Sequence, residues 1–165
     1  MSDSPKTRAE TRPDIGDTVP DIAMEKPEGG TVKPSDYAGK PLVLFFYPKD
    51  NTPGCTTENK DFTALKGEFD AAGVALLGIS KDPPAKHQKF TAKYDLKAPL
   101  ASDAPEDGIA DALGIWLEKS MYGRKYMGME RSTYLVGSDG KIARVWRKVK
   151  VKGHVAEVLE AAQAL

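Results

Sequence analysis

The run Leu42-Val43-Leu44-Phe45-Phe46-Tyr47, enclosed by Pro41 and Pro48, decides the fold. A short, continuously apolar segment bounded by prolines is typical of a strand that is buried on both faces. Val74–Ser80 has the same character, and Phe62, Leu65, Phe69 and Ala72 recur between the two runs at helical spacing. Gly73 supplies a helix stop. This order predicts a βαβ unit with parallel strands and a right-handed crossover.

The sequence after this unit predicts further elements. Asp82-Pro83-Pro84 begins a second helix, residues 99–102 form a short strand, and residues 107–113 have room for about two helical turns. Thr133–Val136 and Ile142–Trp146 flank Gly137-Ser138-Asp139-Gly140, which predicts an antiparallel hairpin before a last helix over residues 155–162. The expected fold class is α/β, a thioredoxin-like fold with a mixed central β-sheet flanked by helices.

The bulk properties favour one domain. The chain has 165 residues, and we expect a flexible N-terminal tail over residues 1–14 before a single domain over residues 15–165. Its 24 basic and 24 acidic residues leave no excess positive charge for a nucleic-acid partner. Residues 1–14 lack the apolar core of a secretory signal, and no apolar run approaches the length of a membrane helix. With a single cysteine, the sequence favours the reducing cytoplasm.

That cysteine, Cys55, lies between the end of the first strand and the start of the following helix. A free cysteine is most often a small buried hydrophobe. However, Thr52-Pro53-Gly54 is a good helix start in which Thr52 caps the helix. Cys55 would then lie in the first turn, where the positive end of the helix dipole stabilises a thiolate. A fixed cation near the sulfur would stabilise such a thiolate further. Spacing alone leaves four candidates, which are Lys49, Arg124, Lys125 and Arg131.

The segment Tyr47–Glu58 resembles the active-site segment of peroxiredoxins, and is closest to the PrxQ branch, also called bacterioferritin comigratory proteins. Pro48, Thr52 and Cys55 fit the core pattern. Residues 116–128 and the triplet Arg131-Ser132-Thr133 are also similar to that branch, so the resemblance runs from about Asp17 to the C-terminus.

The resemblance implies a role for each matching residue. Cys55 would be the peroxidatic nucleophile, and Arg131 would stabilise its thiolate and orient the peroxide. Thr52 would hydrogen-bond the thiolate or the peroxide, Pro48 would shield the pocket from water, and Glu58 would hold Arg131 in place. Each also has a purely structural interpretation, as a cap, a strand terminator or an exposed charge.

The chain departs from the branch in lacking a second, resolving cysteine. The two usual positions are occupied by Lys60 and Thr91. The resemblance therefore implies a one-cysteine cycle, in which hydrogen peroxide or an organic hydroperoxide converts Cys55 to a sulfenic acid that an external thiol resolves. Thioredoxin, glutaredoxin and glutathione are the candidate reductants, and the branch is often monomeric.

Other interpretations remain open. Cys55 could serve a peroxide-sensing thiol switch with little turnover, or a vestigial site in a thioredoxin-like binding module. A Cys/His hydrolase would have to use His87 or His154, for which the sequence offers no hydrolase motif. We interpret both histidines as structural or solvated, and predict neither a metal nor another cofactor. The basic run over residues 144–152 is interpreted as protection of an edge strand, and the aromatic loop over residues 116–127 as packing or as an apolar mouth for organic hydroperoxides.

Overall fold

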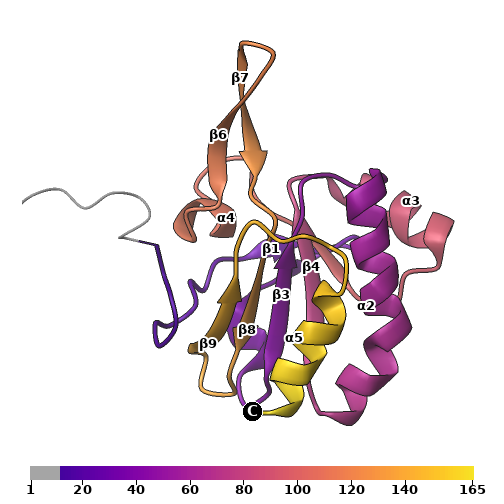
Figure 1. The fold of residues 1–165 in the computed structure, drawn as a ribbon, viewed down its shortest axis with the longest axis vertical. Coiled ribbons are helices and arrows are strands. Elements are labelled where there is room, and N and C mark those ends of the chain that lie inside the picture. Colours follow the sequence, from indigo (N-terminus) through magenta and orange to yellow (C-terminus); the bar gives the residue numbers. More distant parts are fainter. Residues whose placement is uncertain (1–11) are drawn as a thin grey trace, which may run out of the picture.

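The centre of the molecule is a mixed sheet of seven strands in the order β2-β1-β5-β4-β3-β8-β9 (Figure 1). The structure is a computed structural model, and it describes residues 12–165. The strands are β1 (Met24–Glu25), β2 (Thr31–Val32), β3 (Leu42–Phe46), β4 (Ala75–Ser80), β5 (Leu100–Ser102), β8 (Ser132–Val136) and β9 (Ile142–Trp146). β3 pairs in parallel with β4 and antiparallel with β8. The predicted βαβ unit and the predicted C-terminal hairpin are both confirmed.

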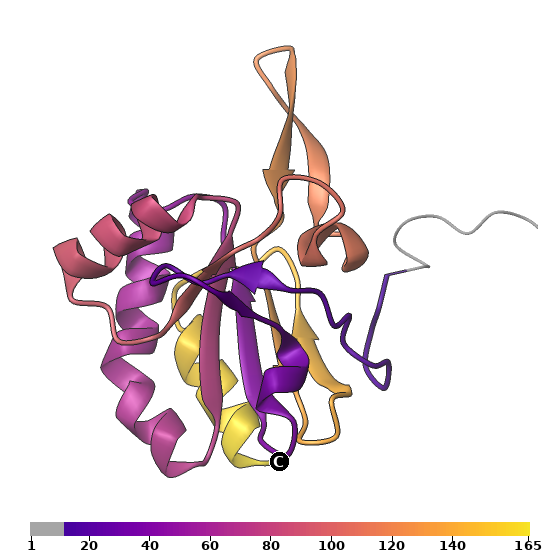
Figure 2. The same cartoon turned by 180° about the vertical axis from the view of Figure 1, so that it is seen from behind.

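Helices cover both faces of this sheet, as expected for a thioredoxin-like fold. The helices α2 (Pro53–Ala71), α3 (Pro84–Tyr94) and α5 (His154–Gln163) contribute to the core on one face. The short helices η1 (Pro34–Tyr37) and α4 (Ile109–Ala112) pack on the other face (Figure 2). Side chains of β3 alternate between the two cores, and on the α2 side Phe45 stacks on Phe62 with ring centroids 4.1 Å apart. The apolar run therefore belongs to a central strand.

A separate hairpin, β6 (Trp116–Met121) and β7 (Arg124–Met129), projects from the end of the sheet where β3 and β4 finish (Figures 1 and 2). Its turn residues Tyr122 and Gly123 have φ angles of +52° and +76°, which suits a two-residue hairpin turn. Tyr122 is 97% exposed. The sequence did not predict these strands, because neither has an apolar face that alternates with a polar one.

Two further elements differ from the prediction. The two turns expected over residues 107–113 form a single turn, α4, because the Asp103 carboxylate accepts hydrogen bonds from Ile109 N and Ala110 N and fixes a late helix start. The two-residue strands β1 and β2 are too short to leave a periodic pattern.

Of the expected N-terminal tail, residues 1–11 lie outside the described residues. Arg12 lies 3.4 Å from Glu130, and Arg147 donates a hydrogen bond to the carbonyl of Pro13. Among residues 12–165, no helix has both the length and the apolar character needed to cross a bilayer.

Candidate active site

Cys55 occupies the third position of α2, directly beyond the carboxyl end of β3. Thr52 is the N-cap and Pro53 the first helical residue, as the sequence predicted. The sulfur therefore lies beside the unpaired N–H groups and the positive end of the dipole of a 19-residue helix. The residue is only 1% exposed. This burial restricts what can reach the sulfur.

Arg131 is the cation that the fold brings to this thiol. Its Nη2 donates to Cys55 Sγ at 3.3 Å, while its Nη1 donates to Glu58 Oε1 at 2.7 Å. Arg131 directly precedes β8, which pairs with β3, so the sheet register carries the guanidinium to the start of α2. Glu58 lies one helical turn after Cys55 on the same face of α2. Three of the predicted site residues thus form one cluster.

Burial controls the electrostatics of this cluster. Glu58 is fully buried, and the loss of hydration raises its pKa to about 7 although the Arg131 guanidinium pulls in the opposite direction. Its second oxygen, Oε2, has no hydrogen-bond partner among the described residues. Burial acts to lower the pKa of Arg131, but the charges of Glu58 and Cys55 outweigh this effect and raise it above its usual value. The guanidinium therefore stays charged beside the sulfur.

Thr52 and Pro48 lie in the loop that leads into α2. The predicted capping bond of Thr52 is wrong, because its hydroxyl turns back and donates to the carbonyl of Lys49 at 2.8 Å. This bond closes the loop on itself, and Thr52 still lies three residues before the sulfur. Pro48 follows β3 and is exposed. The structure gives no hydrogen bond between either residue and Cys55.

The other three candidate cations are exposed. Lys49 is exposed in the same loop, and Arg124 and Lys125 are exposed on the projecting hairpin. Tyr126 and Met127 of this hairpin are 45% and 47% exposed, so they do not pack in the core. The basic run begins on β9, which is an edge strand as predicted.

A buried polar network behind the loop was not foreseen. Asp50 accepts a hydrogen bond from the Tyr47 hydroxyl at 2.6 Å, and its other oxygen lies 2.7 Å from His87 Nδ1. His87 Nε2 faces the carbonyl of Ala101 at 3.0 Å. Both ring nitrogens of His87 therefore have a hydrogen-bond partner in the interior. One signal was available, because His87 shares a helical stripe with Phe90 and Tyr94 and so had to face the core.

The second histidine lies behind Arg131. His154 Nε2 is 2.8 Å from Thr133 Oγ1, and its ring packs edge-on against Trp146. Burial lowers the pKa of His154 to about 4, and the positive charge of Arg131 acts in the same direction. Both histidines are therefore structural, as the sequence indicated. Within residues 12–165, no group of three His, Cys, Asp or Glu side chains has the geometry to hold a metal ion.

Comparison with known proteins agrees with this geometry. The AhpC/TSA family pattern matches residues 15–145. The chain is 46% identical to "Peroxiredoxin Bcp" of Bacillus subtilis over 147 residues, covering 89% of this chain and 93% of the relative.

Two solved structures agree as well. A PrxQ mutant from Xylella fastidiosa superimposes with a TM-score of 0.85 at 39% identity, covering 93% of this chain and 97% of its own. A bacterioferritin comigratory protein from Xanthomonas campestris, solved in work on its alkyl peroxide reduction activity, gives a TM-score of 0.82 at 42% identity, covering 90% and 98%. The resemblance noted in the sequence is confirmed, and the chain belongs to the AhpC/TSA family as a thiol-dependent peroxidase of the Bcp/PrxQ peroxiredoxin branch.

Proposed function

We propose that the protein reduces hydrogen peroxide and organic hydroperoxides by a one-cysteine cycle centred on Cys55. The observation that carries this proposal is the contact between Arg131 and Cys55, in which a fixed guanidinium donates to the sulfur at 3.3 Å. Such a donor stabilises the thiolate, and also the negative charge that develops on the peroxide as the O–O bond breaks. The reported alkyl peroxide activity of the Xanthomonas relative supports organic hydroperoxides as substrates.

In the first half of the cycle, the Cys55 thiolate attacks the terminal oxygen of the hydroperoxide. The S–O bond forms and the O–O bond breaks, so the sulfur is oxidised to a sulfenic acid while the peroxide is reduced. The departing alkoxide or hydroxide takes a proton and leaves as alcohol or water. Arg131 orients the peroxide and Glu58 fixes the guanidinium, while Thr52 and Pro48 shape the entrance.

In the second half, an external thiol resolves the sulfenic acid. Its sulfur bonds to Cys55 as the S–O bond breaks and water leaves, and a second thiol then releases the Cys55 thiolate with formation of a disulfide between the two reductants. The absence of any other cysteine in the 165 residues supports this route, because the chain has no internal thiol to offer. A monomeric enzyme in the cytoplasm remains a prediction from the sequence.

A second function, a peroxide-sensing switch with little turnover, is favoured by the burial of Cys55. A cysteine that is 1% exposed is slow to meet a bulky reductant, so its sulfenic acid would persist. One experiment tests both functions. Peroxide consumption is measured for the wild type and for Cys55→Ser, with glutathione and glutaredoxin or with a thioredoxin system as reductant.

Repeated turnover that Cys55→Ser abolishes supports the peroxidase. A single equivalent of peroxide consumed without turnover supports the switch. If Cys55 is not oxidised by one equivalent of peroxide, as judged by intact-protein mass spectrometry with a sulfenate-trapping reagent, both functions are rejected.

A further inference from the structure

We propose that the resolving thiol is a small thiol bearing carboxylate groups, and that a lysine-lined cavity between α3 and the active-site loop binds its carboxylate. This inference rests on the proposed one-cysteine function and specifies its second substrate. The cavity has a volume of about 240 Å³ and is lined by Asp50, Asn51, Lys86, Lys89, Phe90 and Lys93.

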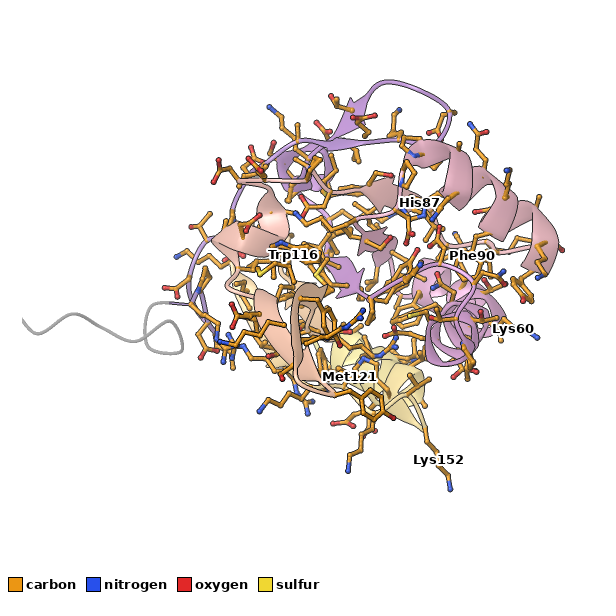
Figure 3. The ribbon with its side chains drawn as sticks, turned by 90° about the horizontal axis from the view of Figure 1, so that it is seen from above. Lys60, His87, Phe90, Trp116, Met121 and Lys152 are labelled. Atoms are coloured by element: carbon orange, nitrogen blue, oxygen red, sulfur yellow. The ribbon has the colours of Figure 1, made fainter. Side chains whose placement is uncertain are left out.

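Three ammonium groups line this cavity from one helix. Lys86, Lys89 and Lys93 recur at intervals of three and four residues, so they share a stripe on the exposed side of α3. His87 and Phe90 occupy the buried side and fix the rotation of the helix, as the view onto this end of the molecule shows (Figure 3). The cations therefore face the loop rather than the core.

These three charges have no anionic partner within the described part of the chain. No carboxylate lies within 4.0 Å of Nζ of Lys86, Lys89 or Lys93, although other lysines such as Lys66 and Lys81 are paired. The one carboxylate in the lining, Asp50, is 7% exposed and directs its oxygens to Tyr47 and His87. Because like charges at helical neighbours repel, an anion in the cavity would be stabilised.

The cavity adjoins the loop that leads to the reactive sulfur. Asn51 Oδ1 accepts hydrogen bonds from Lys93 at 3.3 Å and from the Tyr94 hydroxyl at 2.9 Å, and Asn51 lies four residues before Cys55. Lys49 in the loop and Lys60 on α2, the latter 5.7 Å from the Tyr94 ring centroid, extend the positive charge toward the site. The chain as a whole has equal numbers of basic and acidic residues, so this concentration is local.

The chemistry of the second half-reaction explains why such a cavity would matter. The attacking thiol must approach a sulfur that Arg131 already flanks, and a carboxylate held by lysines beside the loop that precedes α2 would raise the local concentration of that thiol. A reductant without negative charge would gain nothing from the lysines.

The test compares two thiols that differ in charge. Cys55 is first converted to the sulfenic acid with one equivalent of hydrogen peroxide, and its decay is followed with glutathione, which carries two carboxylates, or with glutathione diethyl ester, which carries none. We expect glutathione to react about tenfold faster at low ionic strength, and we expect added salt to reduce this preference. The double variant Lys86→Gln/Lys89→Gln should lose most of the preference while keeping the bond between Lys93 and Asn51.

A matched control removes positive charge from the opposite end of the sheet. Lys40 and Lys141 are exposed there, just before the starts of β3 and β9, and the double variant Lys40→Gln/Lys141→Gln should keep the full preference for glutathione. Equal rates for the two thiols, a preference that survives Lys86→Gln/Lys89→Gln, or resolution by an acidic protein reductant but by neither small thiol would each overturn the proposal. If no sulfenic acid forms in the first step, the proposed peroxidase function itself fails, which is a distinct result.

Discussion

A side-chain carbon added at Gly54 would lie 3.1 Å from Nη2 of Arg131. The glycine directly before the reactive cysteine therefore leaves the room in which the guanidinium reaches the sulfur. Glycine is needed here so that the guanidinium can approach the helix closely. It is not needed for an unusual backbone conformation, because Gly54 has that of an ordinary helical residue.

The first prediction follows from this contact. Gly54→Ala should displace the guanidinium by a few tenths of an ångström and slow sulfenic acid formation about tenfold, because catalysis depends steeply on the placement of the charge. Gly67→Ala is the matched control, since Gly67 lies in the same helix with nothing within 4 Å of an added carbon. Gly67→Ala should leave the rate unchanged and stabilise the protein by about 0.5–1 kcal/mol. Stopped-flow measurement of the peroxide reaction checks the rate. Equal rates for the two variants would contradict the role of Gly54 in leaving room for Arg131.

The second prediction concerns Arg131 itself. Arg131→Met removes the donor to Cys55 and should slow the peroxide reaction about 100-fold or more. Arg131→Lys should recover only part of the loss, because a single ammonium group cannot serve both Sγ and Glu58 as the planar guanidinium does. The double variant Glu58→Gln/Arg131→Met avoids leaving a buried carboxyl alone, and it guards against reading a folding defect as a kinetic one. A rate for this double variant close to that of the wild type would contradict the role of Arg131.

The third prediction is a pH dependence set by Glu58. Its pKa of about 7 lies above its ordinary value of 4.5, so the carboxyl is protonated in the folded enzyme below about pH 7 and ionises as the pH rises through 7. Only the ionised form holds Arg131 as an ion pair, so the rate of sulfenic acid formation should rise through this range. Glu58→Gln keeps an acceptor for the guanidinium but cannot titrate, and the inflection near pH 7 should be missing from its profile. Superimposable profiles for the two proteins would exclude Glu58 as the titrating group.

The fourth prediction is a loss of stability in acid caused by His154. Its pKa falls from 6.5 in the unfolded chain to about 4 in the folded protein, so the unfolded chain binds the proton more readily. The stability due to the neutral ring is fully present above pH 6.5 and is lost as the pH falls toward 4, by about 3 kcal/mol. His154→Gln should flatten this part of the curve. Urea unfolding of both proteins between pH 4 and 7 measures the difference, and parallel curves would refute the assignment.

The fifth prediction concerns the pair behind the loop. His87→Leu removes one hydrogen-bond partner from the buried Asp50 carboxylate and should destabilise the fold by about 3 kcal/mol. Adding Asp50→Asn should restore part of this loss, because the uncompensated charge is then gone. Thermal or urea unfolding of the single and double variants checks the coupling, and strictly additive effects would show that the two residues act independently.

The sequence was sufficient for the parts of the fold in which one periodic pattern persists. The strand Leu42–Phe46 was predicted because burial on both faces leaves a continuous apolar run. The helix Pro53–Ala71 was predicted because one buried face leaves apolar residues at helical spacing. The hairpin β6–β7 was missed because both its strands lie mostly in solvent, where no alternation is imposed. Only the base of the hairpin, at Trp116 and Met129, packs against the core, and this is too short a contact to leave a periodic pattern.

In the candidate site too, local sequence patterns identified some residues and could not identify those that only the fold brings together. Cys55 was found from its position at a helix start, whereas the choice of Arg131 among several cations required the resemblance, because the two residues are 76 positions apart in sequence. The capping bond of Thr52 was predicted wrongly because a threonine hydroxyl at an N-cap can either accept from a helix N–H group or donate to a nearby carbonyl. Here it donates to the carbonyl of Lys49. The bond between His87 and Asp50 joins two elements whose proximity only the sheet topology determines.

The 1% exposure of Cys55 gives the two halves of the cycle unequal access to the same sulfur. Hydrogen peroxide has two heavy atoms and needs only a narrow passage, but we expect a thiol on a tripeptide or a protein to need the loop over residues 48–54 to move aside. At high thiol concentration the turnover number should therefore stop depending on the reductant and become equal to the opening rate of the loop over residues 48–54. The fold itself would then set how long the oxidised state lasts, and with it the time during which a second peroxide can over-oxidise the sulfur.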